Sequence, residues 1–218
     1  PMLHLTNTVI QSSEIGQSIE HFLESRRQSI HAVRHHAAKL LQPNMRVGIY
    51  SRSSLVMQCL TACAEHIPFS VALCESRPML EGRTAAEELT DAAIPVTFMV
   101  DAALSVLTQF SDLVLIGADS ITPSAVTNKI GSRSLCLSAA ADKTPVYCIA
   151  TPDKFLPADL QQPPEPGHNP AEIWETDLPL HFETRYFESF NPELLESLIT
   201  DTGLIPATDI RKIGRAHV

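Results

Sequence analysis

Five short apolar runs, each separated from the next by a helix-length segment, constrain the fold more than any other feature of this sequence. The runs are rich in β-branched residues and lie at 46–50, 69–75, 95–100, 112–119 and 145–151. Strands that are apolar throughout are buried on both faces, and strands that alternate with helices pair in parallel. The sequence therefore predicts an α/β fold with a doubly wound, mostly parallel, Rossmann-like sheet.

The intervals between these runs carry apolar residues at helical spacing. We expect helices at 54–65, 79–92, 103–110 and 129–141, and a helix-like stretch at 192–199. A long N-terminal helix at 17–41 precedes the first strand, and Pro43 and Asn44 end it. We divide the chain here into an N-terminal helical segment, residues 1–42, and a Rossmann-like domain, residues 43–218. Residues 152–172 contain six prolines and are predicted to be a surface excursion.

Charge and composition exclude several functional classes. The 218 residues include 25 acidic and 16 basic side chains, so the formal net charge is -9, which argues against a nucleic-acid-binding face. No apolar run approaches the roughly 18 residues of a membrane helix, and the N-terminus lacks the parts of a secretory signal. Five cysteines in apolar segments fit reduced thiols. We expect a cytoplasmic protein that binds neither nucleic acid nor membrane.

Metal and cofactor motifs are weak in this sequence. His31, His35 and His36 include a pair at i, i+4, but the third ligand and the general base are missing, so a solvated helix face is expected. Cys59 and Cys63 offer only two of the four ligands of a zinc site. No G-x-G-x-x-G follows the first strand, and no P-loop motif occurs. The sequence predicts no metal and no cofactor.

Polar and charged residues follow every predicted strand. Ligands of open parallel sheets bind at the carboxyl ends of the strands, so these residues are candidates for one shared site. The candidates are Ser51, Arg52, Arg77, Glu81, Asp101, Asp119, Asn128, Lys129 and Lys154. The four basic residues among them, with helix N-termini behind, predict a site for a small anion, most naturally a phosphate.

Four of the candidates also have a purely structural interpretation. Arg77 could form a surface ion pair with Glu75. Asp101 and Asn128 could each cap the helix that follows. Asp119 could brace its own loop, because a poorly solvated carboxylate must find hydrogen-bond donors.

Two paired motifs carry a resemblance to a known superfamily. Glu-Ser-Arg-Pro at 75–78 precedes Glu-Gly at 81–82, and Gly-Ala-Asp at 117–119 precedes Asn-Lys-Ile-Gly at 128–131. These segments resemble the domain shared by the α, β and δ subunits of eukaryotic translation initiation factor 2B, the methylthioribose-1-phosphate isomerases and the archaeal ribose-1,5-bisphosphate isomerases. Residues 186–205 resemble the C-terminal segment of the same family.

The resemblance implies roles for several residues. Asp119 would be the proton-transferring acid of the isomerases, Asn128 and Lys129 would contact the sugar phosphate, and Lys154 would be a further phosphate-binding lysine. Isomerisation of an aldose phosphate needs an acid and a base beside the sugar, and fixed cations at the phosphate. The resemblance also implies a homodimer formed through the Rossmann-like domain.

Two features depart from the isomerase pattern. The isomerases carry a catalytic cysteine just after the first strand, where this chain has Tyr-Ser-Arg-Ser at 50–53, closer to the regulatory α subunit. Family members also have an N-terminal helical domain, of which we expect only the last helix here. The interpretation that we favour is a regulatory or non-catalytic protein that binds a phosphorylated sugar or nucleotide. The alternatives are an aldose–ketose isomerase with a substitute base, such as Tyr50 or Asp101, and a translation-factor-like assembly module.

Overall fold

The computed structural model describes residues 15–157 and 165–213 of the chain. Its main sheet has seven strands in the order β10-β9-β7-β4-β1-β2-β3. Their bounds are β1 (Arg46–Ile49), β2 (Ser70–Cys74), β3 (Val96–Met99), β4 (Leu113–Gly117), β7 (Val146–Ile149), β9 (Ser197–Thr200) and β10 (Gly203–Pro206). All neighbouring pairs are parallel except the antiparallel pair of β9 and β10. The predicted doubly wound, mostly parallel sheet is confirmed.

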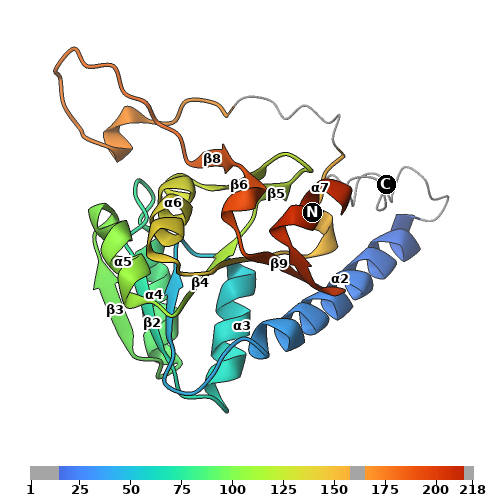
Figure 1. Ribbon diagram of the computed structural model, residues 1–218. Coiled ribbons are helices and arrows are strands. Elements are labelled where there is room, and N and C mark those ends of the chain that lie inside the picture. The colour runs from blue at the N-terminus through green and yellow to red at the C-terminus, as the bar shows by residue number, and fades with distance from the viewer. Residues whose placement is uncertain (1–14, 158–164, 214–218) are drawn as a thin grey trace.

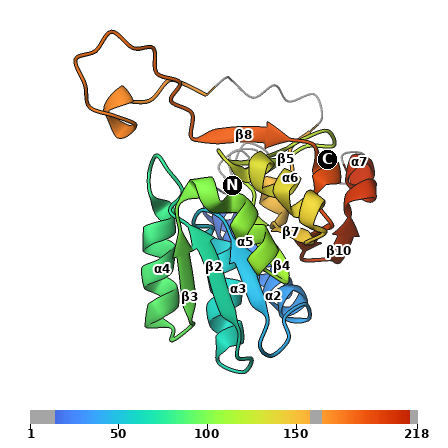
Figure 2. The ribbon, with the colours of Figure 1, turned by 60° about the vertical axis from the view of Figure 1, so that its left-hand side comes forward.

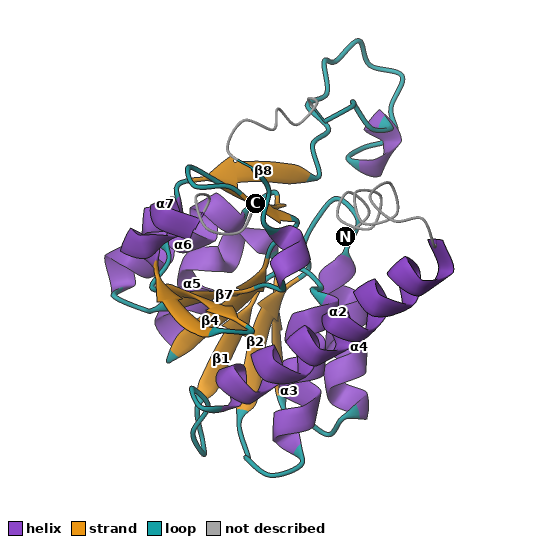
Figure 3. Ribbon diagram, turned by 90° about the vertical axis from the view of Figure 1, so that its right-hand side faces the viewer, coloured by secondary structure: helices purple, strands orange, loops and turns teal. Residues whose placement is uncertain are grey.

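Helices cover both faces of this sheet (Figures 2 and 3). The α-helices are α2 (Ile15–Ala38), α3 (Ser54–Ala64), α4 (Glu81–Asp91), α5 (Leu104–Phe110), α6 (Ser132–Asp142) and α7 (Ile210–Ile213). One core packs α2, α3 and α4 against the first face, and a second core packs α5 and α6 against the other. In β2, Val71 and Leu73 enter the first core, whereas Ala72 and Cys74 enter the second. This alternation explains why the strand is apolar throughout.

Helix α2 is the N-terminal helix expected from the sequence, and it packs on the main sheet. Its buried residues Val33 and Ala37 are spaced by four and join the first core. Ser29 Oγ donates a hydrogen bond of 3.0 Å to Asp201 Oδ2, just beyond β9. The division of the chain at residues 42 and 43 falls in the turn after this helix and stays a prediction.

A second, three-stranded antiparallel sheet lies above the carboxyl ends of the main strands (Figure 1). It consists of β5 (Ser120–Ile121), β6 (Val126–Lys129) and β8 (Phe187–Phe190). The prediction of a helix at 129–141 was wrong at its start, because Lys129 ends β6 and α6 begins only at Ser132. Gly131 separates the two elements with φ of +99°, a conformation that glycine adopts without strain.

The helix-like stretch predicted at 192–199 was also wrong. Residues Pro192–Leu194 form a 3₁₀ turn that Asn191 caps, and Ser197–Thr200 form strand β9. Leu198 and Ile199 are both fully buried, one in each core, as in a strand covered on both faces. Adjacent apolar pairs fit helical spacing as well as a buried strand, so only packing beside β7 decides between them.

The predicted proline-rich excursion projects from the body of the protein (Figures 1 and 2). The prediction covered residues 152–172, but Asp153 is buried and Phe155 packs against the second core, so the first part stays on the body. We call the projecting residues 165–186 the arm. Glu165 accepts hydrogen bonds from the backbone amides of Tyr186, at 2.8 Å, and Phe187, at 3.1 Å, which close the base of the arm. The arm exposes apolar side chains, including Trp174 and Leu178.

Two further findings bear on the expected location. No helix within residues 15–157 and 165–213 is long and apolar enough to cross a membrane. All five cysteines are buried as free thiols. A cytoplasmic location stays a prediction.

Candidate functional site

A cavity of about 280 Å³ opens at the carboxyl ends of the main strands. Residues that follow β1, β4 and β7 form its floor, and the N-terminal turn of α3 forms one wall. The sheet order reverses between β1 and β4, because β2 and β3 lie on one side and β7 and β9 on the other. Open α/β sheets bind their ligands at such a switch point, so the cavity is the candidate functional site.

The structure brings most of the predicted site residues to this cavity. Ser51, Arg52, Glu81, Asp119, Asn128, Lys129 and Lys154 all line it. Arg26, Gln58 and Phe187 also line it, although the sequence pattern did not single them out. Arg26 and Phe187 come from α2 and β8, so inspection of the strand ends alone could not find them.

Arg77 and Asp101 lie outside the residues that line the cavity. Arg77 donates from Nη2 to the backbone carbonyl oxygens of Glu172, at 3.3 Å, and Ile173, at 3.1 Å, so its guanidinium holds the arm. The expectation that Arg77 shares one anion with Lys129 is therefore not met. The suggested ion pair of Arg77 with Glu75 is not formed either; Glu75 lies 3.8 Å from Arg83 instead.

Asp101 braces the loop that follows β2. Its two carboxylate oxygens accept hydrogen bonds from the backbone amides of Ser76, at 2.8 Å, and Arg77, at 2.7 Å. The carboxylate thus satisfies donors of a neighbouring loop instead of capping its own helix. Asp101 is not among the residues that line the cavity, and both of its carboxylate oxygens are already engaged.

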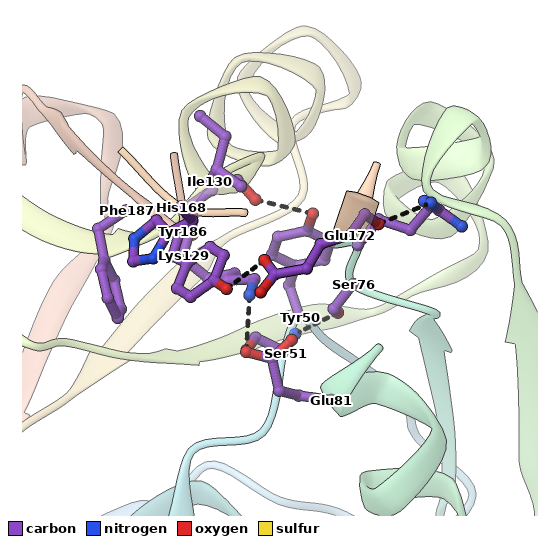
Figure 4. A network of polar contacts seen from close by, with 12 residues as sticks. Tyr50, Ser51, Ser76, Glu81, Lys129, Ile130, His168, Glu172, Tyr186 and Phe187 are labelled. Atoms are coloured by element: carbon purple, nitrogen blue, oxygen red, sulfur yellow. Dashed lines mark hydrogen bonds and ion pairs between the residues drawn. The ribbon is translucent and has the colours of Figure 1, made fainter. Parts of the chain in front are cut away.

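Lys129 is the most constrained cation of the site (Figure 4). It ends β6, only 3% of its side chain is exposed, and its Nζ lies 2.6 Å from Glu81 Oε1. The ammonium also lies 5.2 Å from the centre of the Tyr186 ring, within reach of a cation–π interaction. The second carboxylate oxygen of Glu81 is buried without a hydrogen-bond partner among the described residues.

Asn128 lies in β6 beside Lys129 and is buried. Its Nδ2 donates to Ser132 Oγ at 2.9 Å, and Ser132 Oγ donates to the backbone carbonyl of Lys129 at 2.6 Å. The suggested role of Asn128 as a helix cap is wrong, because the residue belongs to a strand. Its contacts instead join the end of β6 to the start of α6.

Asp119 follows β4 and is exposed to the cavity. Even so, the surrounding protein removes enough water from the carboxyl to raise its pKa above the ordinary value. Lys154 and Lys129 oppose this rise, and Glu81 adds to it. An aspartic acid that keeps its proton to higher pH is better suited to donate that proton near neutrality.

Tyr50 was a suggested substitute base, but its hydroxyl is already engaged. The hydroxyl donates to the backbone carbonyl of Ile130 at 2.9 Å (Figure 4). Burial, reinforced by Asp101, raises the pKa of Tyr50 well above its usual value. The side chain therefore stays protonated at physiological pH and supports the loop before α6.

Within the described part of the chain, none of the cysteines lines the cavity. Cys74, at the end of β2, is fully buried, and this burial raises the pKa of its thiol to about 12. Nor do the described residues contain a group of three or more His, Cys, Asp or Glu that could hold a metal ion. The described residues of the cavity thus offer cations, hydrogen-bond donors and the Asp119 carboxyl with its raised pKa, but no reactive thiolate.

Most of the chain matches the model of one protein family. The model of the Initiation factor 2 subunit family matches residues 3–207. The chain belongs to this family.

Curated relatives include two archaeal ribose 1,5-bisphosphate isomerases. The protein of Thermococcus kodakarensis is 27% identical over 88% of this chain and 63% of its own length. The protein of Pyrococcus furiosus is 29% identical over 91% of this chain and 65% of its own length. The chain therefore spans less than two thirds of the length of either relative.

Solved structures that resemble this chain include two proteins of Pyrococcus horikoshii. The translation initiation factor eIF-2B superposes with a TM-score of 0.77 and 25% identity, over 90% of this chain and 70% of the other. The 5-methylthioribose 1-phosphate isomerase has a TM-score of 0.78 and 20% identity, over 97% of this chain and 67% of the other. This second likeness supports the fold alone.

Proposed function

We propose that this protein binds a small phosphorylated ligand, a sugar phosphate or a nucleotide, in the cavity at the strand ends. In this proposal the protein acts as a regulatory or non-catalytic member of its family. The observation that carries the proposal is the convergence of Arg52, Lys129 and Lys154 with Asp119 on one cavity at the switch point of the sheet.

The chemistry of the walls supports an anionic ligand that also carries hydroxyl groups. Four cationic side chains line the cavity, and together with the N-terminal turn of α3 they favour negative charge. The unpartnered carboxylate oxygen of Glu81 and the amide of Asn128 supply acceptors and donors for hydroxyl groups. A volume of about 280 Å³, near the lower end for ligand pockets, suits a small metabolite.

The state of the two substitute bases suggested from the sequence, Tyr50 and Asp101, supports a non-catalytic role. Proton transfer between neighbouring carbons of a sugar needs both an acid and a base at the reacting atoms. Asp119 can supply the acid, but the cavity presents no cysteine within the described residues, and Tyr50 is held by Ile130. Asp101 lies outside the cavity lining.

Isothermal titration calorimetry tests the proposal. We expect ribose 5-phosphate, ribose 1,5-bisphosphate or a nucleoside monophosphate to bind, and ribose to bind at least tenfold more weakly because it lacks the charged group. The same solution, checked by circular dichroism, must contain folded protein. Folded protein that binds none of the phosphorylated compounds would refute the proposal.

An aldose–ketose isomerase is the second candidate, favoured by the similarity to ribose 1,5-bisphosphate isomerases and by the raised pKa of Asp119. An assay with ribose 1,5-bisphosphate separates the two candidates. Turnover that falls by about 10²- to 10⁴-fold in Asp119→Asn would favour the isomerase. Binding without turnover would favour the non-catalytic protein.

We further propose that the chain forms a homodimer through its Rossmann-like domain, as an assembly module would. Apolar side chains lie exposed at the free edge of the sheet and on α5, namely Phe98, Val100, Val106 and Phe110. Apolar groups gathered in this way often mark a protein–protein contact. A related solved structure, from Chaetomium thermophilum, is the tetrameric eIF2B-beta2-delta2 complex.

Light scattering at micromolar concentration is expected to give twice the mass of the chain. Phe98→Asp should shift the mass to that of the monomer, because it places a charge in the apolar contact. The matched control is Leu23→Asp, whose side chain is exposed on α2, away from this edge. A monomeric wild-type protein, or a dimer that survives Phe98→Asp, would argue against this interface.

A further inference from the structure

One cation of the cavity comes from outside the strand ends. Arg26 lies on α2, and Ile30, one turn further along the same helix, lines the cavity with it. The position of α2 is fixed by its buried residue Val33 and by the hydrogen bond from Ser29 to Asp201. Packing of the helix therefore places Arg26 at the cavity.

The ion pairs of the cavity divide its cations into two sets. Arg52 pairs with Glu88 through Nε and Oε1 at 2.6 Å, and Lys129 pairs with Glu81 at the same distance. Lys154 has no ion pair within 4.0 Å to any residue of the described ranges. Among the described cations of the cavity, Lys154 is therefore the one whose charge no carboxylate within 4.0 Å offsets, whereas Arg26, which lines the cavity with it, has Asp153 at 3.8 Å.

The guanidinium of Arg26 is incompletely satisfied. Its Nε is buried and makes no hydrogen bond to any described residue. Its ion-pair partner, Asp153, is 3.8 Å away from Nε to Oδ2, which is too long for a hydrogen bond. A buried donor without an acceptor costs free energy, so an anion that supplied the acceptor would bind with a corresponding gain.

We infer that Arg26 is an anion-binding residue of the cavity, which together with Lys154 holds the phosphate group of the ligand between α2 and the turn after β7. The inference rests on the proposed function and deepens it. The planar guanidinium donates in a fork that matches two phosphate oxygens, and Lys154 adds a point charge. The N-terminal helix is then part of the binding site and not only a cover of the sheet.

The test compares Arg26→Gln with Arg27→Gln by calorimetry. Arg27 is the next residue, but its side chain is 75% exposed and pairs with Glu24, so it controls for loss of one positive charge on α2. We expect Arg26→Gln to weaken binding of ribose 5-phosphate by about 10- to 100-fold, the range for a lost hydrogen bond to a charged group. Arg27→Gln should stay within about twofold of wild type, because exposed charges are screened.

Inorganic phosphate and ribose are titrated in parallel to find which part of the ligand Arg26 contacts. Arg26→Gln should weaken the binding of inorganic phosphate as much as it weakens the binding of ribose 5-phosphate. It should leave any binding of ribose unchanged. Comparable affinity of wild type for inorganic phosphate and ribose 5-phosphate would assign the site to the free ion. If only ribose 5-phosphate binds tightly, the phosphate group that the site holds belongs to a sugar phosphate.

Other outcomes overturn the inference. If wild type binds and Arg26→Gln binds equally well, or if both variants weaken binding to the same extent, Arg26 does not hold the phosphate and the proposed function still stands. If wild type binds no phosphorylated compound, the proposed function fails and this inference fails with it. Should Arg26→Gln not fold, Arg26→Lys decides: weakened binding by a folded variant supports the inference, and wild-type affinity overturns it, because lysine lacks the fork.

Discussion

Replacing Gly82 by alanine is expected to lower the free energy of unfolding by roughly 2 to 3 kcal/mol, because the new methyl group has no space. A Cβ at this position would overlap the backbone carbonyl oxygen of Cys74 and lie 2.9 Å from the carbonyl carbon of Glu75. These are backbone atoms at the end of β2, so they cannot swing aside as a side chain could. The amide of Gly82 also donates to the carbonyl of Glu75 at 3.1 Å, which ties α4 closely to the strand.

Denaturant unfolding measures this effect, and Gly16→Ala is the matched control. Gly16 lies in α2, and no atom lies within 4 Å of the point that an alanine methyl group would occupy there. Alanine at this position should therefore be neutral or stabilise the protein by up to about 1 kcal/mol. Equal stability of Gly82→Ala and wild type would mean that α4 moves freely relative to β2. In that case the position of Glu81 beside Lys129 would not depend on this close approach.

Replacing Lys129 by methionine is expected to weaken binding of ribose 5-phosphate by about 100-fold, since a charged hydrogen-bond donor is lost from the cavity wall. The variant should also lose roughly 1 to 2 kcal/mol of folding free energy, because Glu81 keeps its charge without the partner 2.6 Å away. This loss is below that of a fully buried pair, since Glu81 is 33% exposed and water screens part of its charge.

Calorimetry and denaturant unfolding check both parts of this expectation. Lys143→Met is the control, because Lys143 is an exposed lysine at the end of α6. Unchanged affinity in a folded Lys129→Met variant would exclude the lysine from the binding site. Unchanged stability together with lost binding would show that Lys129 serves the ligand and that the ion pair with Glu81 adds little to the fold.

The order of strands and helices could be predicted because it depends on local patterns. The five apolar runs became β1, β2, β3, β4 and β7 with only small shifts at their ends. The antiparallel elements could not be predicted in this way. Strands β6 and β8 are paired with each other across a distance of about 60 residues in sequence, and neither alternates clearly enough to be distinguished from loop or helix.

The candidate site was predictable where a residue directly follows a main strand and less so elsewhere. Asp119 and Lys154 reach the cavity for that reason. Arg77 also follows a strand, but its side chain turns to the arm, whose path no local pattern reveals. Arg26 was missed because it approaches the cavity from a helix that precedes the whole sheet.

By itself, the sequence determined the fold class and the edge of the sheet where ligands bind, because both follow from hydrophobic periodicity and from the geometry of parallel strands. The tertiary structure alone decided which charges face each other. It paired Lys129 with Glu81, turned Arg77 to the arm and brought Arg26 to the cavity. Side-chain direction depends on packing between segments far apart in the chain, and no local pattern of residues encodes that packing.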